Sequence, residues 1–138
     1  MSISDINKKS FPGQIRRTVR NYLCLTAVAV LIDNIYALFG HGVRSPAMYL
    51  LFLYPLLGGA LVYLLIGRFV PHMGSREKYR LFYNVHNSGV AILAAGSLLS
   101  GILDIAGTAS AYVPLFYAVG WIFVLAGLAL VFIMKLKP

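Results

Sequence analysis

The sequence predicts an all-α fold, an integral membrane four-helix bundle. Hydrophobic residues make up 59% of the 138 residues and charged residues 12%, where a soluble domain carries roughly 25% charged residues. The apolar residues come in long runs, which leave room for four spans at about 21–39, 46–70, 80–106 and 111–134. We therefore expect a basic segment, 1–20, followed by a transmembrane domain, 21–138.

The basic segment, 1–20, is expected to form a short amphipathic helix on the cytoplasmic side. Its apolar residues recur at spacings of four as Phe11, Ile15, Val19 and Leu23, with arginines elsewhere on the helix. Such a helix lies on the membrane surface or runs directly into the first span.

The first span, 21–39, carries a carboxylate within the hydrocarbon. Asp33 falls on one small and polar face, formed by Thr26, Ala29, Asp33, Ala37 and Gly40. At 1.5 Å per residue, Asp33 lies roughly 9 Å from the outer end of the span. An ionised carboxylate costs about 2.5–3.5 kcal/mol at the centre of a transmembrane helix. Asp33 is therefore either a site for a cation, proton or basic ligand, or a hydrogen-bonded group that holds helices together.

The second span, 46–70, opens with Ser45-Pro46, which predicts a serine cap and a proline in the first turn. Pro55 in its middle has no amide hydrogen and releases the carbonyl of Leu51. We therefore expect a kink at Pro55, and Gly58-Gly59 after it allows another backbone to approach closely.

The third span, 80–106, has a small and polar stripe at the 3.5-residue repeat of a left-handed helix bundle. The stripe is formed by Asn87, Ala91, Ala94, Ser97, Gly101, Asp104 and Thr108, and it is predicted to face protein. His86 is expected at the cytoplasmic membrane interface, hydrogen-bonded to backbone or to a lipid head group. A proton-relay role for His86 stays open.

The fourth span, 111–134, has Pro114 in its first turn and Gly120 and Gly127 within it. Tyr49 and Tyr54 match Tyr112 and Tyr117 at a common offset of 63, which suggests two parallel-repeated helical hairpins as the plan of the bundle.

Basic residues predict the orientation. All Lys and Arg except Arg44 flank one side of the predicted spans, which places both termini in the cytoplasm. This distribution accounts for the net charge of +8 without nucleic acid, and we expect no nucleic-acid partner.

The candidate ligand-binding residues are Asp33, Asp104, His41, Arg44 and Asn87. The first four are expected to converge at the outer tips of the hairpins, where Arg44 and Asp104 are the candidates for a salt bridge. Their spacing matches no metal motif, and we expect neither metal nor cofactor. The lone cysteine, Cys24, cannot form an internal disulfide, and catalytic motifs are missing, so we do not expect an enzyme.

Two segments, FGHGVRSPAMYLLFLYPLLGG at 39–59 and YNVHNSGVAILAAGSLLSGILDIAGT at 83–108, resemble uncharacterised small four-span membrane proteins of Gram-positive bacteria. The resemblance implies a bacterial cytoplasmic membrane. It implies no activity, ligand or site residue.

These observations lead to two function hypotheses. The first is a membrane-embedded binding or transport component for a cation, proton or small polar ligand, with Asp33 as its main contact. The alternative is a non-catalytic interaction protein, an accessory subunit or scaffold, whose small-residue stripes pack against a partner. A membrane enzyme acting on lipid ranks third. The expected partners are the lipid bilayer and either a homo-oligomer or another membrane protein.

Overall fold

The computed structural model describes residues 3–69 and 76–136, with side-chain surroundings for 13–69 and 78–136. The elements are α1 (Ile3–Phe39), a composite helix (Pro46–Phe69), α4 (Arg76–Ala106) and α5 (Val113–Leu136). Four stretches are long and apolar enough to cross a membrane: Gly13–Phe39, Pro46–Phe69, Lys78–Ala106 and Val113–Leu136. The predicted all-α four-helix membrane fold is therefore confirmed, and α1 runs through the predicted boundary at residue 20 without a break.

The composite helix changes its hydrogen-bond register along its length. It consists of α2 (Pro46–Tyr49), a 3-10 turn η1 (Leu50–Phe52), a π-helical segment η2 (Tyr54–Leu61) and α3 (Val62–Phe69). Pro55 lies at the start of the π-helical segment and has no N–H to continue the α-helical ladder. The disturbance expected at Pro55 thus takes the form of a tightened turn before it and a widened segment after it.

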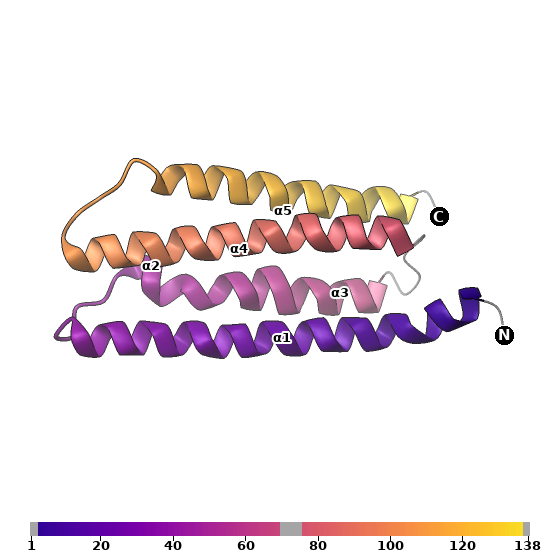
Figure 1. Ribbon diagram of the computed structural model, residues 1–138, viewed down its shortest axis with the longest axis horizontal. Coiled ribbons are helices and arrows are strands. Elements are labelled where there is room, and N and C mark those ends of the chain that lie inside the picture. Colours follow the sequence, from indigo (N-terminus) through magenta and orange to yellow (C-terminus); the bar gives the residue numbers. More distant parts are fainter. Residues whose placement is uncertain (1–2, 70–75, 137–138) are drawn as a thin grey trace.

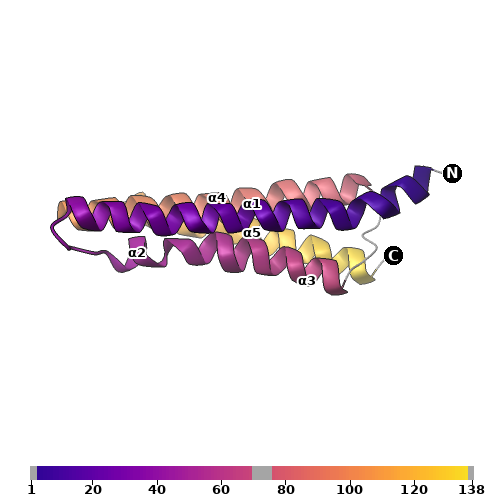
Figure 2. The same ribbon diagram turned by 90° about the horizontal axis from the view of Figure 1, so that it is seen from below.

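The four helices form a zigzag rather than a square. Across Figure 1 the order from one edge to the other is α1, the composite helix, α4 and α5. Figure 2 shows α1 and α4 in one layer, with the composite helix and α5 in the other. The composite helix contacts both α1 and α4, and α5 packs against α4. The composite helix is therefore the floor of a trough whose two walls are α1 and α4.

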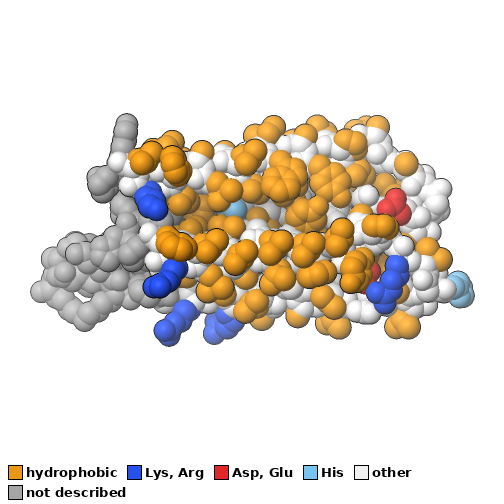
Figure 3. All heavy atoms as spheres, turned by 180° about the vertical axis from the view of Figure 1, so that it is seen from behind, with side chains coloured by type: hydrophobic (Ala, Val, Ile, Leu, Met, Phe, Trp, Pro, Cys, Tyr) orange, Lys and Arg blue, Asp and Glu red, His pale blue; other side chains and the backbone are white. Residues whose placement is uncertain are grey.

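All four helices run between two ends of the molecule. We call the end where α1 begins and α5 ends the terminal end, and the end with the hairpin connections at 40–45 and 107–112 the tip end (Figure 1). A band of hydrophobic side chains covers the middle of the face seen in Figure 3, and most of its Lys and Arg side chains lie near the terminal end. This surface suits an integral membrane protein, because the band faces lipid and the charges lie beside water.

Both tip connections begin with a left-handed residue. His41 (φ 54°) and Gly42 (φ 85°) follow α1, and the Gly42 amide donates to the carbonyl of Ala37 at 2.8 Å. Gly107 (φ 75°) plays the same part after α4, and the Thr108 amide bonds to a carbonyl five residues back at 2.9 Å. These are the six-to-one bonds that close a helix C-terminus. Thr108 consequently lies beyond the helix, so its predicted place in the α4 stripe is wrong.

Glycines bring α4 and α5 into close contact. A Cβ on Gly89 would lie 2.6 Å from the backbone nitrogen of Val124, and one on Gly127 would lie 2.8 Å from the Cβ of His86. A Cβ on Gly120 would lie 2.7 Å from the side chain of Leu93. The Gly89 face of α4 therefore packs against α5, which leaves the predicted stripe to face the composite helix and α1.

Candidate functional site

The tip end holds four of the five predicted site residues, and three of them, Asp33, Arg44 and Asp104, take part in two separate contacts. Arg44 Nη1 donates to Asp33 Oδ2 at 3.2 Å, and Arg44 Nη2 donates to Asn34 Oδ1 at 3.3 Å. The predicted pairing of Arg44 with Asp104 is wrong, because Asp104 Oδ2 instead accepts a hydrogen bond from Ser45 Oγ at 2.6 Å.

Ser45 departs from the prediction as well. It precedes the composite helix in extended conformation, yet its side chain makes no cap hydrogen bond. It reaches across to Asp104 at the end of α4. Two adjacent connection residues, Arg44 and Ser45, therefore attach the first hairpin tip to α1 and to α4.

The polar contacts at the tip end hold neighbouring helices together. The Asp33 side chain is 8% exposed and the Arg44 side chain 47%, so a half-solvated guanidinium covers a buried carboxylate. An ion pair of this kind leaves little unmet negative charge for another cation. His41 is exposed and lines a shallow hollow of about 420 Å³ beside Arg44. Within the described ranges, no three His, Cys, Asp or Glu side chains are arranged to hold a metal ion.

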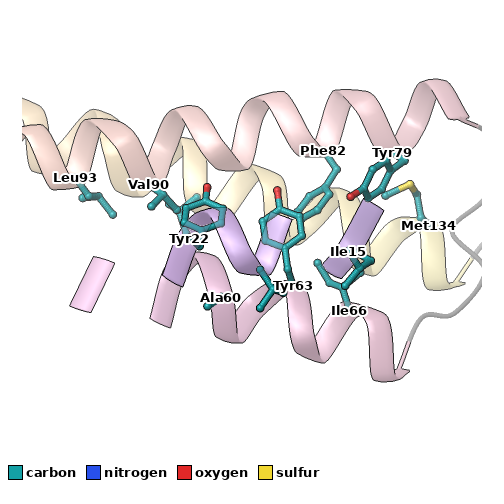
Figure 4. Packing of buried hydrophobic residues seen from close by; sticks show 12 residues of the cluster. Ile15, Tyr22, Ala60, Tyr63, Ile66, Tyr79, Phe82, Val90, Leu93 and Met134 are labelled. Atoms are coloured by element: carbon teal, nitrogen blue, oxygen red, sulfur yellow. The ribbon is translucent and has the colours of Figure 1, made fainter. Parts of the chain in front are cut away.

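Asn87, the fifth predicted residue, belongs to a different cluster in the bundle interior. The hydroxyl groups of Tyr22 and Tyr63 both donate to Asn87 Oδ1, at 2.5 and 2.7 Å. The two tyrosine rings stack at a centroid distance of 5.7 Å, and Figure 4 shows them side by side with both hydroxyls directed toward α4. These bonds join α1, the composite helix and α4 through one carbonyl oxygen.

His86, beside Asn87 on α4, is fully buried, so it does not reach a lipid head group. Its Nε2 lies 2.6 Å from the carbonyl oxygen of Gly58 and donates to it, since a carbonyl can only accept. The ring stacks on Phe82 at 5.3 Å and meets Tyr63 edge-on at 6.0 Å. The backbone part of the expectation holds, and the accepting carbonyl lies within the π-helical segment.

A groove of about 530 Å³ opens beside Asn87, between α1 and α4. Leu51 and Pro55 of the composite helix belong to its floor. Three of the seven lining residues on α4 are alanines, and Asn87 of α4 and Tyr22 of α1 lie where the lining becomes polar. The groove exists because α1 and α4 are both held by the composite helix and pack little against each other.

The predicted α4 stripe faces protein in only part of its length. Ser97 is buried and donates to the carbonyl of Ala47 at 2.6 Å, and a Cβ on Gly101 would lie 2.7 Å from the Cβ of Met48. Ala91, in contrast, is exposed along the groove. The tip half of the stripe is thus a packing surface, and its middle is the wall of an open site.

Sequence reasoning found Asn87 and missed the aromatic residues around it. Tyr79, Phe82, Tyr83 and His86 lie at helical spacings on one side of α4, and this pattern was the available signal. Comparison of the chain with known protein families, curated proteins and solved structures gave no match.

Proposed function

We propose that this chain is a non-catalytic binding protein of the membrane, which holds one small amphipathic molecule in the groove between α1 and α4. The observation that carries the proposal is the groove itself: it has about 530 Å³ of space, apolar walls and a polar end. Binding sites of this size are mostly apolar, with a few fixed polar groups that orient the ligand.

Asn87 supplies the fixed polar group. Two tyrosine hydroxyls, those of Tyr22 and Tyr63, donate hydrogen bonds to its Oδ1. Among the described residues its amide nitrogen makes no hydrogen bond, and Asn87 lines the groove. Its two N–H groups are therefore available to an acceptor oxygen of a ligand.

The tip residues support this binding role better than cation or proton transport. Asp33 is paired with Arg44, and Asp104 accepts from Ser45, so both carboxylates hold helix ends together. A closed tip and an open groove favour entry of the ligand from the side, out of the lipid.

A second candidate is an interaction protein whose partner places a helix in the same groove. Ala91, Ala94 and Ala95 along the α4 wall favour it, because small residues let two helices approach closely. This role needs no small ligand. The purified protein should retain a small molecule under the first candidate and a polypeptide under the second.

We also propose that the terminal end faces the cytoplasm of a bacterial cell. The positive-inside rule supports this orientation, since all Lys and Arg except Arg44 lie toward that end of the spans.

Native mass spectrometry of protein released from a mild detergent tests the proposal. Ala95 is exposed on the groove wall, so Ala95→Phe should fill the groove. Ala129→Phe on α5 is the matched control, since Ala129 is exposed outside the groove. We expect one bound small molecule on wild type and on Ala129→Phe, and none on Ala95→Phe. Bare wild-type protein, or retention by Ala95→Phe, would refute the proposal, and a co-purified polypeptide lost in Ala95→Phe would support the second candidate.

A further inference from the structure

The two walls of the groove change from polar to apolar at the same level. Both α1 and α4 run from the terminal end to the tip end (Figure 1), so their residues can be compared step by step. On α1 the facing residues are Gln14, Arg17, Thr18 and Asn21, followed by Leu25, Val28 and Ile32. On α4 they are Arg80, Tyr83, Asn84 and Asn87, followed by Ala91, Ala94, Ala95 and Leu98.

The polar part of these walls encloses a second hollow, of about 490 Å³. Thr18, Asn21 and Tyr83 line both hollows, so the two hollows adjoin each other. Arg17 and Arg80 lie on opposite walls of the terminal hollow, and none of the lining residues within 13–69 and 78–136 is acidic. The result is one trough with a basic, hydrogen-bonding head and an apolar tail.

We infer that the occupant of this trough is an anionic phospholipid, with its phosphate head group between Arg17 and Arg80 and an acyl chain along the alanine wall. The inference rests on the proposed function and names its ligand class. Charge complementarity selects the anionic head group, because Arg17 and Arg80 both line the hollow and the part of its lining that the structure describes carries no carboxylate.

The levels of the basic hollow and of the apolar groove along the spans match the levels of the phosphate and the acyl chains of a bilayer lipid. The basic hollow lies near the terminal end, where the apolar spans Gly13–Phe39 and Lys78–Ala106 begin. Phosphates of the bilayer lie at this level, and acyl chains lie toward the middle. From Leu25 to Ile32 the apolar wall of α1 runs about 10 Å at 1.5 Å per residue. A lipid can therefore enter sideways with its head and tail already at the right depths.

The test is a titration of purified protein in mild detergent, read by native mass spectrometry. The probes are lysophosphatidylglycerol and lysophosphatidylcholine with the same acyl chain. The double variant Arg17→Gln/Arg80→Gln removes both charges of the hollow. The matched control, Arg16→Gln/Arg20→Gln, removes two exposed arginines of α1 that do not line it.

Wild type should prefer the anionic probe, and the preference should fall by about fivefold for each hollow arginine removed. The control should keep the preference. If the two double variants behave alike while Ala95→Phe abolishes binding of both probes, the head-group inference is overturned and the groove-binding function stands. If Ala95→Phe binds both probes like wild type, the groove-binding function and the head-group inference are both refuted. A dimer lost in Ala95→Phe would identify a second copy of the chain as the occupant and overturn the inference.

Discussion

Replacing Asn87 by alanine should destabilise the bundle through two tyrosines at once. Tyr63 is 0% exposed and donates to Asn87 Oδ1, so without Asn87 its hydroxyl cannot reach water. A buried donor without a partner costs about 1–3 kcal/mol. Tyr22 is 7% exposed and borders the groove, so its lost bond should cost nearer the roughly 0.6 kcal/mol average between membrane helices. Together these terms lower the free energy of unfolding by about 1.5–3.5 kcal/mol.

A double-mutant cycle measures this coupling in a mixed-micelle unfolding titration. The cycle compares Asn87→Ala, Tyr63→Phe and their combination, and Tyr63→Phe removes only the donated hydroxyl. We expect a coupling energy of about 1 kcal/mol or more, and a smaller one for the parallel cycle with Tyr22→Phe. Asn84→Ala is the control, since Asn84 is exposed one turn away on α4. If Asn87→Ala costs the same with and without the Tyr63 hydroxyl, the shared-acceptor reasoning is wrong.

Three further predictions use the same titration. Gly89→Ala should cost about 1–3 kcal/mol, because its Cβ would lie 2.6 Å from a backbone nitrogen of α5. Gly13→Ala is the control, because Gly13 has open space around it and its substitution should not lower the free energy of unfolding. Equal losses of stability in Gly89→Ala and Gly13→Ala would contradict the close-packing argument. His41→Gly should raise the free energy of unfolding by about 0.5–1 kcal/mol, because glycine adopts the left-handed backbone at φ 54° without strain. A loss of stability would show that contacts of the His41 side chain outweigh this backbone strain. Arg44→Gln should lower the free energy of unfolding by about 1–3 kcal/mol, because it leaves the buried Asp33 carboxylate without its partner, and in that background Asp33→Asn should cost nothing further. A full Asp33→Asn penalty in that background would contradict the ion pair.

The fold could be predicted from local features of the chain. A run of about twenty apolar residues can satisfy its backbone in lipid only as a helix, so the runs alone predict the four spans. The glycines at 42 and 107 likewise mark helix ends, because a left-handed residue is favoured there. The small residues near Ser97 and Gly101 correctly indicated a packing face.

The candidate site was predictable only in part. The sequence was sufficient to assign Asp33, Arg44 and Asp104 to the tip end. It was not sufficient to predict which residues they contact. Adjacent residues of an extended chain point in different directions, so Arg44 and Ser45 reach different helices. The burial of His86 could not be predicted either, because the position of a residue along a helix does not show which neighbouring helix covers its side chain.

By itself the sequence determined that the protein is a helical membrane protein with four spans, because hydropathy and span length are properties of consecutive residues. Only the tertiary structure decided that the helices lie in a zigzag and that α1 and α4 stand apart over the composite helix. The physical reason is that a stripe of small residues looks the same whether a neighbouring helix fills it or leaves it open. Close contact of Gly89 with α5 turns the Ala91 side of α4 toward the groove. That choice depends on the packing of all four helices together.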